Sequence, residues 1–166
     1  MNKKGSIQDL VMIAIILGVF SFLILLGYRI YSEINTEFQS SSIINDQGKQ
    51  ASTTINNMFP GALDNSFLIL TVGLGIVAIS LAALVRVHPV FLVFFILMLA
   101  IIIFFCGIFS NIYEELANAD ATMEALASDL TFSTHVMHYL PFIVGIFGGI
   151  LAIVMYKAYR EAQYGM

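Results

Sequence analysis

Two histidines three residues apart are the side chains of this sequence best placed to do chemistry. His135 and His138 lie in the segment THVMHYL, and on a helix they would share one face, which is the geometry of two metal ligands. Asp129 and the carboxylates before it are the available further ligands. Because the spacing defines no third ligand, we expect two interfacial histidines and no bound metal. Metal binding or proton transfer at this pair is the alternative.

Other patterns that would carry chemistry are missing from the sequence. The one cysteine, Cys106, lies inside an apolar run and is expected to pack as a small hydrophobic side chain. The sequence contains no phosphate-binding loop, dinucleotide fingerprint, HExxH pair or haem-attachment motif. It also has no pairing of a nucleophile with a base inside an apolar run. We therefore predict a non-enzymatic protein without a cofactor.

The composition indicates that the elements carrying these residues lie in lipid. Of 166 residues, 59% are hydrophobic and 11% are charged, and the mean hydropathy is +0.90. Soluble domains carry about 25% charged residues, so a chain this apolar is expected to be an integral membrane protein with the lipid bilayer as its first partner. The net charge of −4 argues against nucleic acid as a partner, because phosphate contacts need clustered Lys and Arg.

Four apolar runs are long enough to cross a bilayer as helices, which takes about 20 residues each. Membrane β-strands would instead alternate over about ten residues. The short connection RVHP predicts a tight hairpin between the second and third spans, with Pro89 in the first turn of the third and Pro141 similarly placed in the fourth. We predict an all-α fold, a single four-helix transmembrane domain over residues 1–166, with spans at about 10–28, 67–85, 90–109 and 139–156.

Basic residues orient the four spans. The positive-inside rule places the side with more Lys and Arg in the cytoplasm or its topological equivalent. This predicts both termini on the cytoplasmic-equivalent side, with outside loops at about 31–66 and 110–138. The seven tyrosines lie at or just beyond the span ends, as in an aromatic belt. The inside would hold the topology anchors Lys3, Lys4, Arg86, Lys157 and Arg160, and the outside only Arg29 and Lys49.

The first outside loop is polar and rich in Ser, Asn and Thr. The first helix can extend past the bilayer into SEINTEF, and the rest is expected to be a mobile loop or to order against a partner. Pro60 and Gly61 are expected to break the chain there. Asp64 or Asn65 is then the expected cap of the second span.

The last outside loop predicts an amphipathic helix over residues 111–130. One stripe is apolar, and the other face carries five acids and no Lys or Arg, whereas helices that lie on lipid usually carry basic residues. We expect this helix to pack on the bundle or on another protein, either as a solvated connector or as a docking surface for a basic partner. The stripe comprises Ile112, Leu116, Met123, Leu126 and Leu130, and the acids are Glu114, Glu115, Asp120, Glu124 and Asp129.

Small residues in two spans are expected at helix–helix contacts. Gly73 and Gly75 in the second span and Gly145 and Gly149 in the fourth would let backbones approach closely in lipid, within the chain or between copies. The few hydroxyl groups within spans can donate to carbonyls of their own helix. These hydroxyls belong to Ser21, Thr71 and Ser80.

The opening segment MNKKGSIQDL admits a cleaved signal, a pilin-type processing site or the cytoplasmic end of a permanent helix. The segment GYRIYSEI after the first span offers no signal cleavage site. A pilin would continue into a soluble head, whereas three more spans follow here. We favour the permanent helix, in which Lys3 and Lys4 anchor the topology and Ser6 with Asp9 forms a capping pair.

Five segments carry a resemblance to a family: KKGSIQDL, GYRIYSEI, NMFPGALDNSFLIL, RVHPVF and FSNIYEE. In these the chain resembles small multi-span membrane proteins of tailless, internal-membrane-containing viruses with double-jelly-roll capsids. The resemblance implies a structural protein of the virion internal membrane that organises the bilayer and links it to capsid or vertex proteins through acidic outside loops. It implies a homo- or hetero-oligomer in a larger assembly and no catalytic residue.

Two other classes of protein remain open from the sequence. An accessory subunit of a cellular membrane complex predicts co-purification with a larger enzyme or secretion machine. A holin-like lysis protein predicts that expression alone permeabilises the host membrane. Holins often carry a strongly charged tail, and the tail here, KAYREAQYGM, is only mildly basic.

Overall fold

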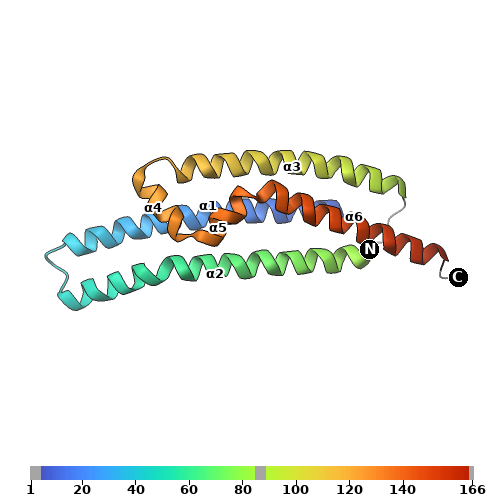
Figure 1. Ribbon diagram of the computed structural model, residues 1–166. Helices are drawn as coiled ribbons and strands as arrows, with labels where there is room; N and C mark the ends of the chain where they lie inside the picture. Colours follow the sequence, from blue (N-terminus) through green and yellow to red (C-terminus); the bar gives the residue numbers. More distant parts are fainter. Residues whose placement is uncertain (1–4, 85–88, 165–166) are drawn as a thin grey trace.

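Six helices make up the part of the chain that the structure describes (Figure 1). The structure is a computed structural model that describes the backbone of residues 5–84 and 89–164 and the side chains of 10–80, 90, 92–157 and 160. Four of the helices are long and apolar enough to cross a membrane, which confirms the all-α fold with four candidate spans. The helices are α1 (Gly5–Ser40), α2 (Asp46–Leu84), α3 (Pro89–Ala117), α4 (Ala121–Asp129), α5 (Thr131–His138) and α6 (Leu140–Tyr164).

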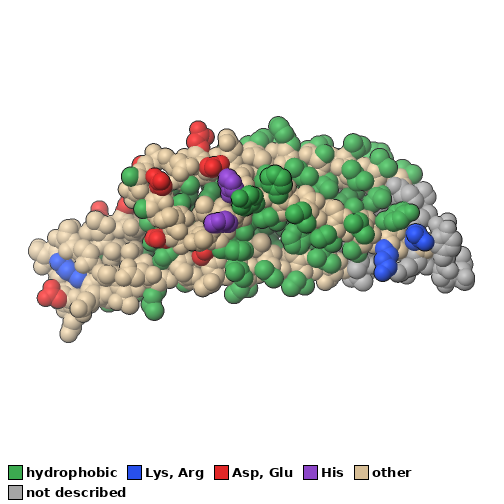
Figure 2. All heavy atoms as spheres, viewed as in Figure 1, with side chains coloured by type: hydrophobic (Ala, Val, Ile, Leu, Met, Phe, Trp, Pro, Cys, Tyr) green, Lys and Arg blue, Asp and Glu red, His purple; other side chains and the backbone are tan. Residues whose placement is uncertain are grey.

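The bundle has two distinct ends (Figure 1). The start of α1 and the end of α6 lie together at one end, called here the terminal end, while the α1–α2 turn, α4 and α5 form the opposite, hairpin end. Acidic side chains gather over the hairpin end, and hydrophobic side chains cover the four-helix part between the ends (Figure 2). Lys157 and Arg160 lie at the terminal end, whereas Lys3, Lys4 and Arg86 fall outside the described residues. The side of the membrane that each end faces stays a prediction.

Aromatic contacts fix the heights at which the long helices lie side by side. Phe20 of α1 stacks on Phe67 of α2 with ring centroids 6.2 Å apart, and Phe22 meets Tyr113 of α3 at 5.7 Å. Immediately beyond these rings, toward the hairpin end, α2 and α3 expose polar side chains, and we call this height the polar level. The exposed polar residues just beyond it are Asn65, Ser66, Glu114 and Glu115.

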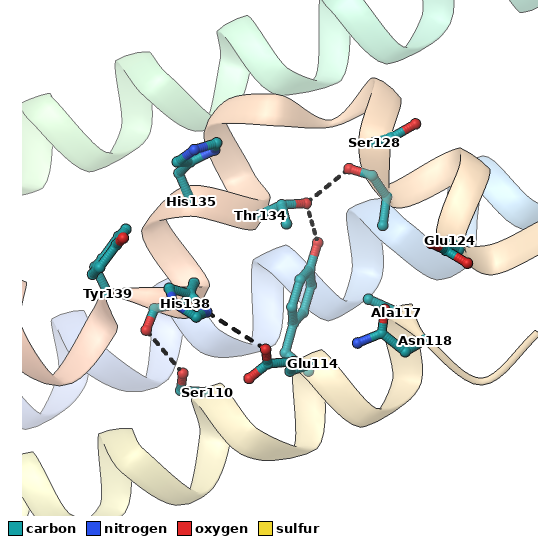
Figure 3. Close-up of a pocket in the computed structure, with 12 residues that line it drawn as sticks. Ser110, Glu114, Ala117, Asn118, Glu124, Ser128, Thr134, His135, His138 and Tyr139 are labelled. Atoms are coloured by element: carbon teal, nitrogen blue, oxygen red, sulfur yellow. Dashed lines mark hydrogen bonds and ion pairs between the residues drawn. The ribbon is translucent and has the colours of Figure 1, made fainter.

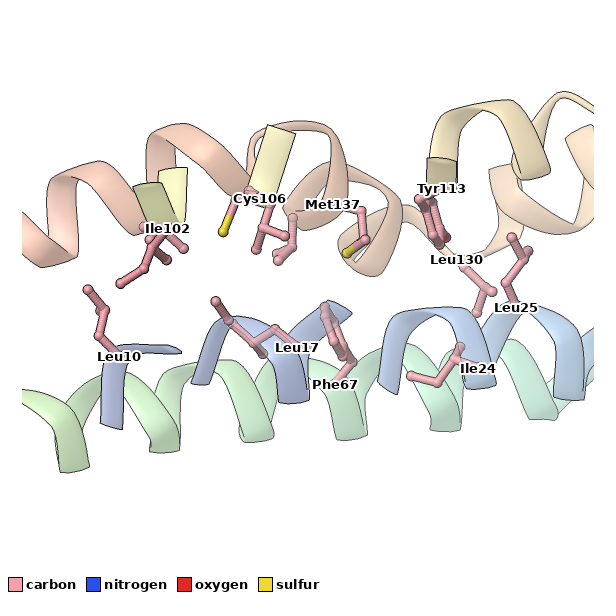
Figure 4. Close-up of a cluster of buried hydrophobic side chains, with 14 of the residues drawn as sticks. Leu10, Leu17, Ile24, Leu25, Phe67, Ile102, Cys106, Tyr113, Leu130 and Met137 are labelled. Carbon is pink, nitrogen blue, oxygen red and sulfur yellow. The ribbon is translucent and has the colours of Figure 1, made fainter. Parts of the chain in front are cut away.

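The helix that contains the first span continues well beyond the range 10–28 expected for that span. Tyr28 lies about 12 Å beyond Phe20 along α1, given a rise of 1.5 Å per residue, and so stands well past the polar level. Leu25 and Tyr28 are nevertheless buried, because α4 and α5 pack against this part of α1. Figure 4 shows the resulting core, which continues from Leu10 to Leu25 along α1 and includes Cys106, buried as predicted.

The outside loop expected over 31–66 is a helical hairpin. The Gln39 amide donates to the Lys49 carbonyl at 2.9 Å, and the Ser52 hydroxyl donates to Asn35 Oδ1 at 2.7 Å, so α1 and α2 are joined close to their turn. The extension of the first helix is therefore confirmed to Ser40.

The break expected at Pro60 and Gly61 is wrong, because α2 continues through both residues. Pro60 is buried, and the segment around it is held against α1, where Phe59 stacks on Tyr31 with ring centroids 4.6 Å apart. Packing of this segment against α1 thus keeps the chain helical, although the proline lacks an N–H group to donate. The cap of α2 is Asn45, whose Oδ1 accepts the Gly48 N–H at 2.9 Å.

The single amphipathic helix expected over 111–130 is divided into two. Helix α3 ends at Ala117, and α4 starts after Asp120, whose carboxylate accepts the Met123 N–H at 2.8 Å as an N-cap. This cap starts a new helix in a new direction, so the apolar stripe is not continuous. Met123, Leu126 and Leu130 are buried, Leu116 is half-buried and Ile112 is exposed, while the five acids expected on the other face are all exposed.

Candidate functional site

Three carboxylates hold the hairpin end to the bundle. Asp64 lies inside α2, where the backbone N–H groups are bonded within the helix, so it does not cap the second span as expected. Its two oxygens instead accept the N–H groups of Phe132 and Ser133, both at 2.7 Å, and cap the first turn of α5. A side chain 68 residues away in sequence thereby fixes the entry into the last span.

Two further carboxylates tie α4 to α1. The Tyr28 hydroxyl donates to Asp129 Oδ2 at 2.9 Å, and Arg29 lies 3.3 Å from Asp120 Oδ2 while its Nε donates to Glu33 at 3.0 Å. The acids at 120 and 129 were expected to face water, on a solvated connector or on a docking surface for a basic partner. Asp120 and Asp129 instead make an ion pair and a hydrogen bond within the molecule. The acids without a hydrogen bond or ion pair among the described residues are Glu37, Asp46, Glu115 and Glu124.

An open cleft of about 390 Å³ lies between α3, α4 and α5 (Figure 3). Its rim carries both predicted histidines together with Glu114 and Glu124. His138 Nδ1 lies 3.7 Å from Glu114 Oε1, with both side chains about half exposed at 53%. His135 Nδ1 donates instead to the Thr131 carbonyl of its own helix at 2.7 Å. The two imidazoles therefore have separate partners.

The only ion pair at the cleft among the described residues is that of His138 with Glu114. Among the residues that the structure describes, no group of three His, Cys, Asp or Glu side chains is arranged to hold a metal. The hydroxyls that line the cleft donate to backbone carbonyls: Ser110 to His138 at 3.2 Å, Ser128 to Ala125 at 2.6 Å and Thr134 to Ala127 at 2.9 Å.

A buried hydroxyl group underlies the cleft. The Tyr113 hydroxyl lies 3.2 Å from Thr134 Oγ1, and Tyr113 itself is only 2% exposed. Ser21 Oγ is buried without a well-formed hydrogen bond within the described residues, although the Tyr113 phenol is its polar neighbour. Tyr113 and Tyr28 therefore act inside the protein, not in a lipid-facing aromatic belt. The remaining span hydroxyls behave as expected, with Thr71 donating to Phe67 and Ser80 to Ile76, each at 2.8 Å.

Of the four predicted packing glycines, two lie at helix contacts. A Cβ at Gly75 would come within 3.0 Å of the Phe147 ring, and one at Gly145 would touch Ile103 at 3.5 Å. Gly73 and Gly149 face open space within the chain, because a Cβ at either position would have no atom within 4 Å. The closest approach is at Gly148, where a Cβ would overlap the Leu99 side chain. A GxxxG pattern therefore predicts which helix packs closely on a neighbour, but it does not predict which of its glycines lies at the contact.

The capping pair predicted at the start of the chain cannot be placed. The backbone of Ser6 and Asp9 belongs to α1, but their side chains lie outside the described residues. The pair stays a prediction.

Comparison of the chain with protein-family models, with curated proteins and with solved structures gives no match. The function must therefore be argued from the residues themselves. Sequence reasoning named Asp64 and Asp129 but missed their partners, α5 for Asp64 and Tyr28 for Asp129. The only signal for these contacts was an acid or a tyrosine beside an apolar run.

Proposed function

We propose that this chain is a non-enzymatic structural membrane protein whose hairpin end stands outside the bilayer and binds a protein of a surrounding shell. The observation that carries the proposal is a set of exposed apolar side chains on the α1–α2 hairpin, with Ile43 in the turn and Ile55 and Met58 farther along α2. Ile43 is 94% exposed, Met58 70% and Ile55 51%, well beyond the polar level. Large apolar side chains exposed along a projection are typical of a surface that another protein covers.

The fixed geometry of the hairpin end supports this function. Its helices are joined to the bundle by Asp64 and by the contact between Tyr28 and Asp129, so little ordering entropy remains to be lost on binding. The exposed acids nearest the tip, Glu37 and Asp46, favour a partner with basic groups around an apolar patch. The four-helix part then anchors this platform in lipid.

The setting we propose is the internal membrane of a virion, with a capsid or vertex protein as the partner. This rests on the resemblance of the turn and span-end segments to small membrane proteins of tailless viruses. The alternatives, a subunit of a cellular membrane complex and a holin-like protein, differ in their neighbours. A capsid-side partner identifies the virion, a larger cellular enzyme or secretion machine identifies the subunit, and leakage of host membranes on expression alone identifies the holin.

Carboxyl-directed crosslinking of the intact particle or membrane tests the proposal. A carbodiimide joins an exposed carboxylate to a nearby lysine without a spacer. We expect Glu37 and Asp46 to become joined to lysines of a different protein, whereas Asp64, which is bonded to α5, should react little. Crosslinks confined to copies of this chain would overturn the proposal.

A further inference from the structure

The cleft between α3, α4 and α5 is rich in hydrogen-bond acceptors (Figure 3). The hydroxyl groups of Ser110, Ser128 and Thr134 each donate their only proton to a backbone carbonyl, at distances between 2.6 and 3.2 Å. Since the Thr134 proton is used in this way, the Tyr113 phenol is the donor in its 3.2 Å contact with Thr134 Oγ1. These four hydroxyl oxygens can therefore only accept from a ligand.

The histidines add few donors to the cleft. His135 Nδ1 lies 2.7 Å from the Thr131 carbonyl, which can only accept, so the ring donates through Nδ1 and its neutral form presents Nε2 as a further acceptor. The donors that remain among the lining side chains are the Asn118 amide, the Tyr139 hydroxyl and one N–H of neutral His138. Acceptors therefore outnumber donors at the cleft.

The cleft also has a negative formal charge. Glu114 and Glu124 line it, and no Lys or Arg in the described part of the chain does. The 3.7 Å between His138 Nδ1 and Glu114 exceeds the usual hydrogen-bond length of about 3 Å. Glu124 has no hydrogen bond or ion pair among the described residues. Both carboxylates are therefore open to a ligand.

We propose that this cleft binds a primary ammonium group, carried by a lipid head group or by a free amine. Such a group combines a positive charge with three N–H donors and no acceptor, which complements carboxylates surrounded by acceptor oxygens. A quaternary ammonium has the charge but no N–H donor. An anion would meet two carboxylates and few donors. This binding does not depend on what the α1–α2 hairpin binds.

The position of the cleft places it within reach of lipid. Tyr113 lies at the polar level, and Tyr139 immediately precedes α6, which contains the last candidate span. The head groups of a bilayer occupy the region just beyond its hydrocarbon core. A lipid whose acyl chains lie beside α3 and α6 can therefore place its head group in the cleft.

Native mass spectrometry of the full chain with two lipids tests the proposal. Dioleoylphosphatidylethanolamine and dioleoylphosphatidylcholine share their tails and net charge, but only the first has ammonium N–H donors. If the ammonium is that of a lipid, we expect the wild type to retain the first at least about threefold more than the second, as one or two added hydrogen bonds would give. Glu114→Gln combined with Glu124→Gln should abolish the preference. The control, Glu33→Gln combined with Glu115→Gln, removes the same charge outside the cleft lining and should keep it.

An NMR titration of the same proteins with ethylammonium chloride distinguishes the source of the ammonium. Saturable binding that requires Glu114 and Glu124, together with equal retention of the two lipids, identifies a free amine. The lipid preference identifies a head group. The proposal is overturned if the wild type shows neither effect, if the control variant loses it equally, or if tetramethylammonium chloride binds as tightly as ethylammonium. Carbodiimide coupling of Glu124 in native membranes only to a lysine of another protein would also overturn it.

Discussion

Asp64 in α2 caps α5 through Phe132, whose backbone N–H it meets at 2.7 Å, and through the following N–H of Ser133 at the same distance. A carboxylate that satisfies two N–H groups at a helix start stabilises that helix through both hydrogen bonds and the helix dipole. The contact links the second span to the segment that leads into the fourth. It is therefore the clearest point at which the fold of the hairpin end can be tested.

Removing this carboxylate should loosen the hairpin end. We expect Asp64→Ala to lower the free energy of unfolding by about 2 kcal/mol, and Asp64→Asn by roughly half as much because one acceptor oxygen remains. Hydrogen exchange of the Phe132 and Ser133 amides in nanodiscs measures the effect locally. Glu115→Gln, at an exposed acid without a hydrogen bond, is the matched control and should leave exchange unchanged. Equal exchange in Asp64→Ala and the wild type would refute the cap.

The hydrogen bond between Tyr28 and Asp129 should contribute measurably to the docking of α4. Tyr28→Phe keeps the ring and removes the hydroxyl, so a loss of about 1 kcal/mol is expected in thermal unfolding. Tyr31→Phe is the control, because the Tyr31 ring stacks on Phe59 and its hydroxyl has no hydrogen bond among the described residues. If both variants lose the same stability, the bond to Asp129 contributes nothing specific.

Glycines in the spans should differ sharply in their tolerance of a methyl group. Gly148→Ala forces the buried Leu99 to move, and we expect destabilisation of about 1–3 kcal/mol from overpacking. Gly73→Ala adds a methyl into open space and should be neutral, or stabilising by up to about 1 kcal/mol through helix propensity. Resistance to unfolding in detergent compares the two. Similar losses in both variants would contradict the α3–α6 contact.

The histidines at the cleft should behave as surface groups. An exposed ion pair of the kind between His138 and Glu114 contributes about 0–1 kcal/mol, so His138→Ala should change stability little. Zinc added to the wild-type protein should leave its melting temperature unaltered. A zinc-dependent rise that disappears in both His135→Ala and His138→Ala would instead establish the metal site.

Hydropathy predicted the four long helices because each contains an apolar run long enough for a membrane. It could not predict that α4 and α5 would pack on the end of the expected first span, where Leu25 and Tyr28 are buried by protein. Proline statistics failed at Pro60, where packing against α1 overrides the local preference. Asp64 was recognised as a helix cap, but it was assigned to the wrong helix. It caps α5, and no local sequence pattern encodes this contact between distant segments.

The most direct test of the proposed function is photocrosslinking from the hairpin tip. A photoreactive amino acid at Ile43, the most exposed apolar side chain in the described part of the chain, is activated in the intact particle or native membrane, and the adduct is identified by mass spectrometry. The proposed function predicts an adduct with a different protein on the outer side of the bilayer, such as a capsid or vertex protein. Adducts with lipid alone, or with no other molecule, would contradict it.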